Sequence, residues 1–330
     1  MDSFEWVDAT SVEQAVALLT AAAVQGGPVV AKAGGIDLID LIKEGVVRPA
    51  RVVNLRSIEG LDRIAFDERG GLSIDALVTL AQIESSPEVR GRYPALAESA
   101  RHAATPQVRN AATIGGTLLQ RPRCWYLRNH YFHDDGVDAA AALASGEHQY
   151  HAIFDNAACA LVHASTPATA LVAYGARVHL AGPGGRERTV PLHEFLRPPR
   201  FEQDRDTTIE PGEILTRVTV PAAARGTRAA YHKQTERDSY DWPICDVAVV
   251  LEMNGDAVAA ASIVLGWVAP TPRRASASEQ ALIGKPLTEA LAREAAAHAV
   301  AGATPLAKNR FKVPILEAVV RRTLRAAAGA

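Results

Sequence analysis

The sequence is poor in features that define several large classes of proteins. It has 3 cysteines in 330 residues, a sparse and odd set that excludes a disulfide framework and favours a reducing compartment. Aromatic residues make up only 5 %, so platforms for stacking nucleic-acid bases are not expected. Lysine and arginine (35) nearly balance aspartate and glutamate (37), and the formal net charge of −2 lacks the basic footprint of a nucleic-acid-binding protein.

Signals for export and membrane insertion are also missing. No apolar run reaches about 18 residues, the length that a transmembrane helix needs, so no membrane association is expected. The opening residues, MDSFEWVDATSVEQAVALL, are acidic and have neither the basic nor the apolar region of a signal peptide. These features predict a cytoplasmic protein, which would be periplasmic only if it were exported together with a partner.

The chain is rich enough in apolar residues to form sizeable cores. Its hydrophobic fraction is 48 %, which excludes disorder as the main state. At about 100–200 residues per domain, the length predicts two or three domains.

The first 60 residues predict a small βαβ unit. Apolar residues recur at helical spacing over 9–24. Short apolar runs at 29–33 and 51–55 predict buried strands, and their lack of alternation is typical of parallel sheets. The glycine pair 34–35 follows the first of these strands, and a helix is expected over 36–43.

The remaining elements predict an α+β protein. We expect a strand and a helix over 70–83, a helix over 93–104, a turn-rich segment over 105–120, a hairpin over 177–195 and a strand over 213–221. The small polar stretch 222–228 is the expected domain boundary. Beyond it, two antiparallel strands joined at 254–256 precede alanine-rich helices over 287–303 and 314–328, an order typical of α+β domains.

Two glycine pairs are candidate phosphate-binding loops. Gly34 and Gly35 lie between a strand and a helix, where the backbone can approach a phosphate closely. Thr113 and Thr117 flank the second pair, Gly115–Gly116. Neither loop has the spacing of a Rossmann or P-loop motif, and each alone is also typical of an ordinary tight turn. Together they could hold one pyrophosphate from two sides.

The order of the segments resembles the FAD-binding (medium) subunit of the molybdenum hydroxylases, the family of xanthine dehydrogenase, aldehyde oxidoreductase and carbon monoxide dehydrogenase. The matching segments span nearly the whole chain: AGGIDLIDLIKEG (33–45), LSIDALVTLAQIE (72–84), ATPQVRNAATIGGTLLQ (104–120), PGEILTRVTVP (211–221), YHKQTERDSYD (231–241) and LGWVAPTPRRA (265–275). Within this family, the segments 120–128, 151–154 and 307–324 most resemble the FAD subunit of the periplasmic-type aldehyde oxidoreductase.

The resemblance implies a fold of three parts. The first two are the lobes of an FAD-binding domain of the vanillyl-alcohol-oxidase-like, PCMH type, a βαβ lobe over 1–60 and a larger lobe over 61–222. The second lobe contains a degenerate iron–sulfur loop at 121–160. The third part, 223–330, is a CO-dehydrogenase-flavoprotein-like C-terminal domain with a three-stranded antiparallel sheet and helices.

The resemblance also implies FAD as the cofactor and assigns its contacts. They come from the first glycine loop, the second glycine loop, a later hydroxyl motif, a strand near the isoalloxazine ring and a lysine near its pyrimidine end: Lys32, Ala33, Gly34, Gly35, Ile36, Asp37, Leu38, Thr113, Gly115, Gly116, Thr117, Ser165, Thr166, Ile214, Leu215 and Lys233. No catalytic residue is implied for this subunit.

Three of these positions depart from the family's pattern. Ile36 replaces a threonine, Thr117 replaces an asparagine, and Thr166 replaces an aspartate that would hydrogen-bond the ribityl or ribose hydroxyls. Each lost polar contact typically weighs about 0.5–1.5 kcal/mol, so the three together would weaken FAD binding. The backbone donors of both loops survive these changes, and we still expect FAD.

The cysteines are a second departure. Cys124 and Cys159 match the first and last of four cysteines that hold a [4Fe–4S] cluster in the aldehyde oxidoreductase branch, and the middle two are missing. Two thiolates are too few for that cluster, so we expect a degenerate loop without metal. A Cys₂His₂ zinc site with His133 and His151 is the alternative, although its spacing is unlike that of a zinc finger. Cys245 lies in an apolar strand and is expected to be a buried thiol.

The resemblance implies an electron-transfer subunit. A molybdenum-cofactor large subunit would oxidise the substrate, a [2Fe–2S] small subunit would pass electrons to FAD in this chain, and an external acceptor (O₂, a quinone or NAD⁺) would receive them. Two alternatives stay open: a scaffold homologue that has lost FAD, favoured by the substituted contacts, and a self-contained flavin oxidase or dehydrogenase.

Overall fold

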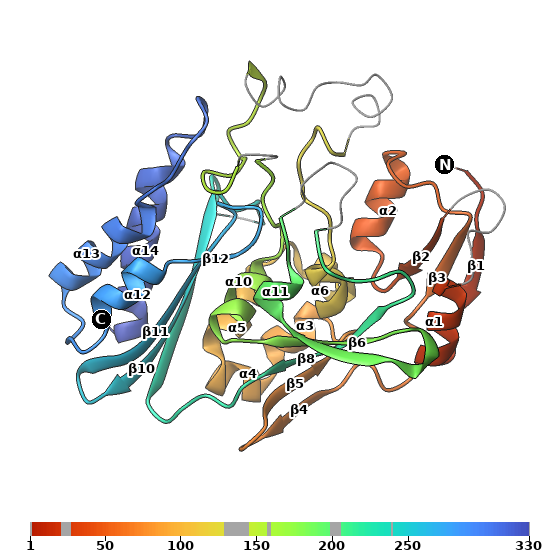
Figure 1. Cartoon of the computed structure of the whole chain (residues 1–330), viewed down its shortest axis with the longest axis horizontal. Coiled ribbons are helices and arrows are strands. Elements are labelled where there is room, and N and C mark those ends of the chain that lie inside the picture. Colours follow the sequence, from red (N-terminus) through yellow and green to blue (C-terminus); the bar gives the residue numbers. More distant parts are fainter. Residues whose placement is uncertain are drawn as a thin grey trace.

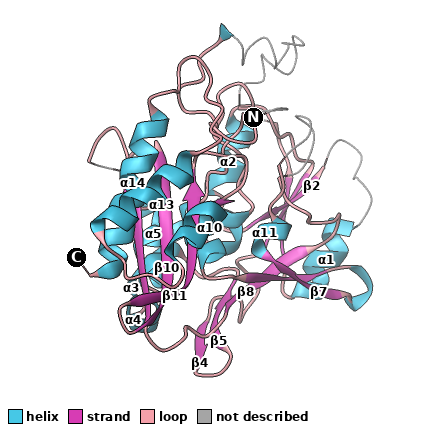
Figure 2. Ribbon diagram, turned by 60° about the vertical axis from the view of Figure 1, so that its left-hand side comes forward, coloured by secondary structure: helices cyan, strands magenta, loops and turns pink. Residues whose placement is uncertain are grey.

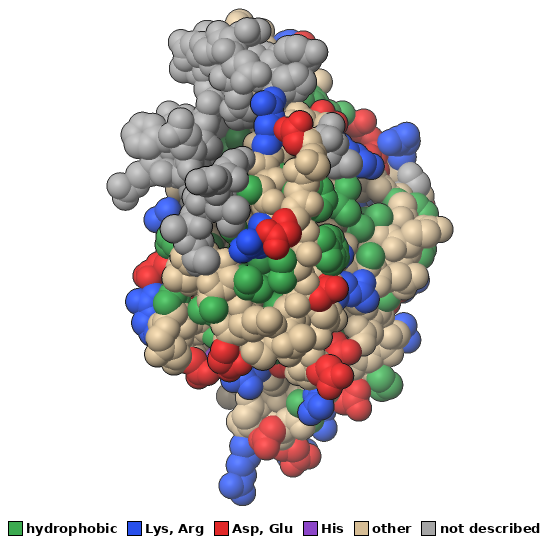
Figure 3. All heavy atoms as spheres, turned by 90° about the vertical axis from the view of Figure 1, so that its right-hand side faces the viewer, with side chains coloured by type: hydrophobic (Ala, Val, Ile, Leu, Met, Phe, Trp, Pro, Cys, Tyr) green, Lys and Arg blue, Asp and Glu red, His purple; other side chains and the backbone are tan. Residues whose placement is uncertain are grey.

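Three sheets organise the residues that the computed structural model describes, which are 2–20, 28–128, 145–156, 160–198, 206–238 and 240–329 (Figure 1). A three-stranded sheet lies at one side of the molecule, a five-stranded sheet lies in the middle, and a four-stranded sheet lies at the other side. On the face shown in Figure 3, acidic and basic side chains are interspersed, as the balanced composition leads one to expect.

The three-stranded sheet forms the first lobe. It contains β1 (Glu5–Asp8), β3 (Arg51–Asn54) and β2 (Val29–Lys32) in that order, and both neighbouring pairs are parallel. Helices α1 (Val12–Thr20) and α2 (Ile36–Lys43) connect the strands. The predicted parallel strands and the helix over 36–43 are confirmed. The predicted helix over 9–24 is described only as far as Thr20.

No pattern in the sequence predicted strand β1. Its residues EWVD contain no apolar run, and three of the four are exposed because the strand lies at the edge of the sheet. Parallel pairing with β3 therefore builds a strand that hydrophobic periodicity cannot detect.

The five-stranded sheet belongs to the second lobe. Its antiparallel order is β4 (Ile64–Asp67), β5 (Gly71–Asp75), β8 (Ile214–Val220), β6 (Arg177–Ala181) and β7 (Glu187–Pro191). Helices cover it: α3 (Leu80–Ser85), α4 (Pro87–Arg92), α5 (Pro94–Arg101), α10 (Thr166–Ala173) and α11 (Leu192–Phe195). Alternate strand residues such as Leu72, Ile74 and Val218 are fully buried in one core cluster with Leu96 and Leu171 of the helices. The predicted hairpin over 177–195 is confirmed in β6 and β7.

The segment 105–120 is helical, and the expectation of a turn-rich segment was wrong. It forms α6 (Pro106–Ala111) and α7 (Ile114–Leu118), so the glycine pair 115–116 lies inside a short helix. The hydroxyls of Thr105 and Thr113 accept hydrogen bonds from the backbone N–H groups of Val108 and Gly116 and cap the two helices. Such caps stabilise a helix by about 1 kcal/mol, which offsets the unfavourable helix propensity of one glycine.

The third sheet is four-stranded, one strand more than the resemblance implied. Its antiparallel order is β12 (Arg273–Arg274), β11 (Ala257–Gly266), β10 (Cys245–Asn254) and β9 (Thr227–Gln234). The extra strand, β12, has only two residues, too few for a periodic signal. Helices α12 (Ser276–Leu282), α13 (Glu289–Val300) and α14 (Lys312–Ala328) follow it.

The four-stranded sheet has helices on both faces. Helices α13 and α14 lie on its outer side, and α5 and α10 of the second lobe lie on its inner side (Figures 1 and 2). Tyr231, Ala248 and Val264 of this sheet belong to the core of the second lobe, so that core runs into the C-terminal third.

Among the described residues, none of the helices combines the length and the apolar character needed to cross a membrane.

Candidate functional site

A cavity of about 640 Å³ lies where the first lobe, the second lobe and the C-terminal third meet. Fifteen of the sixteen residues expected to contact FAD line it, and Ser165 is the exception. The Ser165 hydroxyl instead accepts a hydrogen bond from Ala168 N and caps α10. The cavity volume is within the range of small-molecule and cofactor sites.

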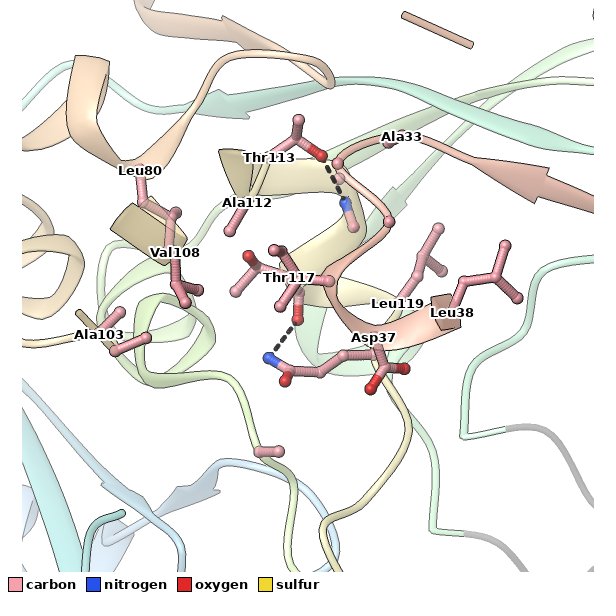
Figure 4. Close-up of a pocket in the computed structure, with 18 of the residues that line it drawn as sticks. Ala33, Asp37, Leu38, Leu80, Ala103, Val108, Ala112, Thr113, Thr117 and Leu119 are labelled. Atoms are coloured by element: carbon pink, nitrogen blue, oxygen red, sulfur yellow. Dashed lines mark hydrogen bonds between the residues drawn. The ribbon is translucent and has the colours of Figure 1, made fainter. Parts of the chain in front are cut away.

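The first lobe contributes the loop between β2 and α2. Gly35 adopts a left-handed backbone (φ 82°), which ends the strand and starts the helix. Gly34 packs directly on the second lobe, and a Cβ on it would collide with the carbonyl oxygen of Ala111. In Figure 4, Ala33 and Leu38 of this segment lie beside Thr113 and Thr117 of the second lobe. The predicted meeting of the two glycine segments at one cavity is therefore present.

The second lobe contributes the start of α7. Gly115 packs against Ala76, and an added Cβ would lie 3.0 Å from the carbonyl oxygen and the Cβ of Ala76. The Thr113 hydroxyl caps the helix, and Thr117 O accepts a hydrogen bond of 2.9 Å from Gln120 Nε2 (Figure 4). This packing leaves a smooth wall of small side chains, which a flat or extended ligand can approach closely.

Two lysines supply positive charge to the cavity. Lys32 lies at its first-lobe edge, with Nζ 5.2 Å from the ring centre of Trp6. Lys233 comes from β9, and its Nζ donates a hydrogen bond of 2.8 Å to His102 O. Burial lowers the pKa of both amines, and for Lys233 the nearby Asp246 and Asp241 oppose that shift. Both positions suit an anionic ligand.

The carboxylates at the start of α2 are paired with arginines. Arg128 Nη2 lies 2.5 Å from Asp37 Oδ1, and Arg128 Nη1 lies 2.8 Å from Asp40 Oδ2. Arg123 lies 3.2 Å from each of the same carboxylates, and the backbone N–H of Arg121 donates to Asp37 Oδ2. Asp37 therefore does not present an unpaired negative charge to a phosphate in the cavity. Sequence reasoning missed this network, although the basic segment 120–128 that carries it was noted for its resemblance.

The substituted positions line the cavity without restoring the lost contacts. Thr166 Oγ1 donates to Ser99 O at 3.1 Å, so its hydroxyl is already used within the second lobe. Ile36 is partly exposed at the cavity edge. Nearby, burial lowers the pKa of His163 to about 4, so this imidazole is neutral at neutral pH.

Ile214 and Leu215 are buried in β8 and form part of the cavity wall. The C-terminal third adds the segment 240–243. Tyr240 and Asp241 end the matching segment 231–241, whereas Trp242 and Pro243 lie beyond it. Trp242 is half exposed, and no motif marks it.

The candidate metal loop is described only in part. Cys124 Sγ lies 3.2 Å from His151 Nε2, whereas Cys159 and His133 lie outside the described residues. Within the described ranges, no group of three or more His, Cys, Asp or Glu side chains could hold a metal ion. Cys245 is fully buried as predicted, and burial raises the pKa of its thiol to about 12.

Two family models together cover nearly the whole chain. Residues 2–223 match the FAD binding domain in molybdopterin dehydrogenase, and residues 230–327 match the CO dehydrogenase flavoprotein C-terminal domain.

Curated proteins and solved structures agree with these matches. The chain is 31 % identical over 312 residues to the aldehyde oxidoreductase FAD-binding subunit PaoB of Escherichia coli (strain K12), covering 91 % of each chain. It is 31 % identical over 328 residues to the carbon monoxide dehydrogenase medium chain of Hydrogenophaga pseudoflava, covering 98 % of this chain and 96 % of that one. A solved structure of carbon monoxide dehydrogenase from Hydrogenophaga pseudoflava superposes with a TM-score of 0.77 at 29 % identity, covering 99 % of this chain and 98 % of that one.

Proposed function

Because the chain belongs to the family of FAD-binding medium subunits of the molybdenum hydroxylases, we propose that it binds FAD in the 640 Å³ cavity and transfers electrons within a heteromeric oxidoreductase. FAD is the cofactor of this family, and the FAD-binding domain occupies residues 2–223. Bound flavin links carriers of single electrons to acceptors of two electrons.

The observation that carries the proposal is the meeting of the two glycine segments. The loop at Gly34 and the helix start at Gly115 come from different lobes and share one cavity wall. In the first loop, glycine lets the backbone approach a pyrophosphate closely, and Lys32 adds a positive charge at the same edge. In the second segment, Gly115 N and Gly116 N already donate to Ala76 O and Thr113 Oγ1, so this segment supplies a close wall. The arginine-paired Asp37 adds no net repulsion, so this end of the cavity suits the pyrophosphate of FAD.

Lys233 has the role of a positioning cation at the other end. The hydrogen bond from its Nζ to His102 O fixes the amine between β9 and the end of α5. A cation held beside a flavin stabilises the anionic reduced form, which tunes its electron affinity.

We further propose that the partners are a molybdenum-cofactor large subunit and a [2Fe–2S] small subunit. Relatives named medium chain or FAD-binding subunit support this assembly, and the chain covers more than 90 % of the length of those compared above. On this proposal the chain is not active on substrate alone.

The test is purification of the full chain, alone and from a host that also makes its partners. The expected result is a flavin absorption spectrum, with molybdenum and iron eluting together with the chain only when the partners are present. A colourless chain that elutes without either metal would contradict the proposal.

A scaffold that has lost FAD is the second candidate, and one observation favours it. The Thr166 hydroxyl is used by Ser99, so nothing at that position replaces the lost aspartate. Titration with excess FAD separates the two candidates, because the scaffold remains free of flavin whereas the electron-transfer subunit reconstitutes. A self-contained oxidase would instead show flavin reduction by a small substrate without partners.

A further inference from the structure

A buried carboxylate lies behind the wall of the cavity proposed to bind FAD. Asp246 of β10 is fully buried, and it pairs directly with Lys233 of β9 in the register of the four-stranded sheet. Residues paired in this way lie on the same face of a sheet. Lys233 lines the cavity, and its Nζ is fixed by the hydrogen bond to His102 O. The carboxylate therefore stands one residue behind a cation that faces the ligand.

Hydroxyl groups hold the carboxylate. Tyr231 Oη donates to Asp246 Oδ2 at 2.7 Å, and Thr169 Oγ1 of α10 donates to Asp246 Oδ1 at 2.9 Å. A hydroxyl can accept a hydrogen bond as well as donate one, so the same two partners can also bind a protonated carboxyl group. The site can therefore hold Asp246 in either charge state without moving a side chain.

The surrounding backbone is shaped to admit this carboxylate. Gly266 of β11 pairs with Asp246, and a Cβ on Gly266 would collide with Asp246 Oδ1 and Thr169 Oγ1. The absence of a side chain at position 266 therefore allows the carboxylate and the hydroxyl to meet. Burying a carboxylate among neutral partners is costly, and such groups concentrate at functional sites.

A row of hydroxyls leads from Asp246 to the cavity. The Tyr231 hydroxyl has a second hydrogen-bond partner besides Asp246, which is the hydroxyl of Thr166. Thr166 lines the cavity. A proton can pass along such a row by exchange between neighbouring oxygens, so Asp246 is buried and yet connected to the ligand site.

Asp246 is the member of this cluster that changes charge near neutral pH. Burial raises its pKa to about 7, although Tyr231, Thr169 and Lys233 oppose the shift. Burial also raises the pKa of Tyr231 well above its usual value and that of the Cys245 thiol to about 12, so both groups stay protonated.

The other charged groups face Lys233. Burial lowers the pKa of this amine, Asp241 opposes the shift, and Arg109 adds to it. Burial lowers the pKa of His102 at the end of α5, and Glu98 opposes that shift. An ionised Asp246 therefore supports the charge of Lys233, together with Asp241.

We propose that Asp246 takes up a proton when a flavin in the adjoining cavity is reduced, and so cancels the negative charge that the flavin gains. The inference rests on the proposed function for the presence of the flavin. Reduction delivers two electrons and one proton to the flavin, which gains one negative charge. A second proton binds the Asp246 carboxylate, which loses its negative charge, and both protons come from solvent. The uptake follows because a new negative charge near a carboxylate raises its affinity for a proton.

The test measures how many protons accompany the two electrons. The midpoint potential of the FAD-loaded full chain is determined by titration with dithionite between about pH 6 and about pH 8. The wild type is expected to take up about one proton at the lower pH, where Asp246 is already protonated, and about two at the higher pH. The slope of potential against pH therefore about doubles across this range. Asp246→Asn keeps the shape of the side chain and cannot ionise, so its slope is expected to stay at about one proton per two electrons.

Asp241→Asn is the matched control. Asp241 also lies beside Lys233, but Arg237 holds the pKa of its carboxyl below the usual value, so it stays ionised throughout the range. Its replacement is expected to shift the potential and to leave the increase in slope intact.

Tyr231→Phe is the second variant, because it keeps the ring and removes one hydrogen bond to the charged carboxylate. Loss of that bond favours the protonated form of Asp246, so the increase in slope is expected to move to higher pH by about one unit or more.

Infrared difference spectroscopy identifies the group that receives the proton. On reduction at about pH 7.5, the wild type is expected to gain the C=O band of a protonated carboxyl group, and Asp246→Asn is expected to lack it. In the chain without flavin, the same band is expected to appear as the pH falls through about 7, a readout that does not need the cofactor.

Equal slopes in the wild type and Asp246→Asn, or a doubled slope without the carboxyl band, would overturn the inference. In a chain that binds flavin, either result leaves the proposed function standing. A chain that binds no flavin overturns both.

Discussion

Single glycines decide how closely the two lobes approach each other at the 640 Å³ cavity proposed to bind FAD, which we call the flavin cavity. Gly34 lies against the backbone of Ala111 and Ala112, with no room for a side chain. The obstacle is backbone in a capped helix, so it cannot rotate away as a flexible side chain would.

We predict that Gly34→Ala separates the lobes and weakens FAD binding. Overpacking of this kind costs about 1–3 kcal/mol. If the strain weakens FAD binding by that amount, the affinity for FAD falls by about tenfold or more. Flavin fluorescence titration measures the affinity. Gly91→Ala is the matched control, because an added Cβ there meets nothing within 4 Å. Equal affinities for the two variants would contradict the prediction.

At the scale of elements, α2 is attached to the second lobe by charge. Asp37 and Asp40 lie one turn apart on α2, and the largely buried guanidinium of Arg128 bonds to both. Arg128 Nε also donates to Pro122 O at 2.8 Å, so the same side chain shapes the start of the degenerate loop.

Arg128→Met is predicted to destabilise the fold and loosen α2. The variant removes hydrogen bonds to two charged groups, but Arg123 still faces both carboxylates and Asp40 is nearly half exposed. The expected loss is therefore about 1–3 kcal/mol, below that of a fully buried pair left without compensation. Chemical denaturation measures the loss. Arg293→Met removes an exposed pair with Glu289 in α13 and is expected to cost less than about 1 kcal/mol. Similar losses in both variants would refute a special role for Arg128.

The cap of α7 offers a test that separates stability from binding. Thr113→Ala removes the hydroxyl that accepts from Gly116 N at 3.2 Å, and Thr288→Ala removes the equivalent cap of α13, where the hydroxyl accepts from Leu291 N at 3.2 Å. Each is expected to cost about 1 kcal/mol of unfolding free energy. Only Thr113→Ala is expected to weaken FAD binding, and a similar effect of Thr288→Ala would count against the assigned site.

Elements with a strong local signal could be predicted from the sequence. The helix 36–43 and the strands around it follow from apolar runs and a glycine pair, and the structure has them there. Helices α6 and α7 were not predicted, because the glycine pair favours a turn, although Thr105 and Thr113 are residues that cap helices. The pairing of Asp37 and Asp40 with Arg123 and Arg128 could not be predicted, because it joins residues more than 80 positions apart.

At the scale of the whole molecule, a buried carboxylate joins the second lobe to the C-terminal third. Asp246 in β10 is fully buried. It accepts hydrogen bonds from Tyr231 Oη at 2.7 Å and from Thr169 Oγ1 of α10 at 2.9 Å. Burial raises the pKa of this carboxyl to about 7, although Tyr231, Thr169 and the charge of Lys233 oppose the shift.

This joint predicts a pH dependence of stability. Because the folded pKa of Asp246 is above its unfolded value of 3.8, protonation stabilises the folded state. The contribution of protonated Asp246 to the free energy of unfolding is complete below about pH 4 and is lost as the pH rises to about 7. Asp246→Asn is therefore expected to gain stability relative to the wild type on going from about pH 4 to pH 8, by at most about 4 kcal/mol.

Urea denaturation of both proteins across this pH range measures the effect, with Asp256→Asn in an exposed turn as the control. A constant difference between Asp246→Asn and the wild type would contradict the assignment.

The family could be identified from the order of segments along the whole chain, whereas the supporting contacts of the site could not. The resemblance placed Lys233 beside the cavity, but the contribution of Trp242 and Pro243 to its wall depends on how the C-terminal third packs on the second lobe. Such packing depends on the complementary surfaces of the two folded parts and leaves no periodic pattern in the sequence.

The residues that line the flavin cavity also determine when, during synthesis of the chain, the cofactor can bind. Its wall begins near residue 31 and is completed by Trp242 and Pro243, which come from beyond both lobes. A ribosome must therefore have made about three quarters of the chain before any ligand can meet the whole wall. Cofactor loading then reports that the N-terminal and C-terminal parts have docked, and a chain interrupted before residue 240 would hold its ligand on an incomplete surface.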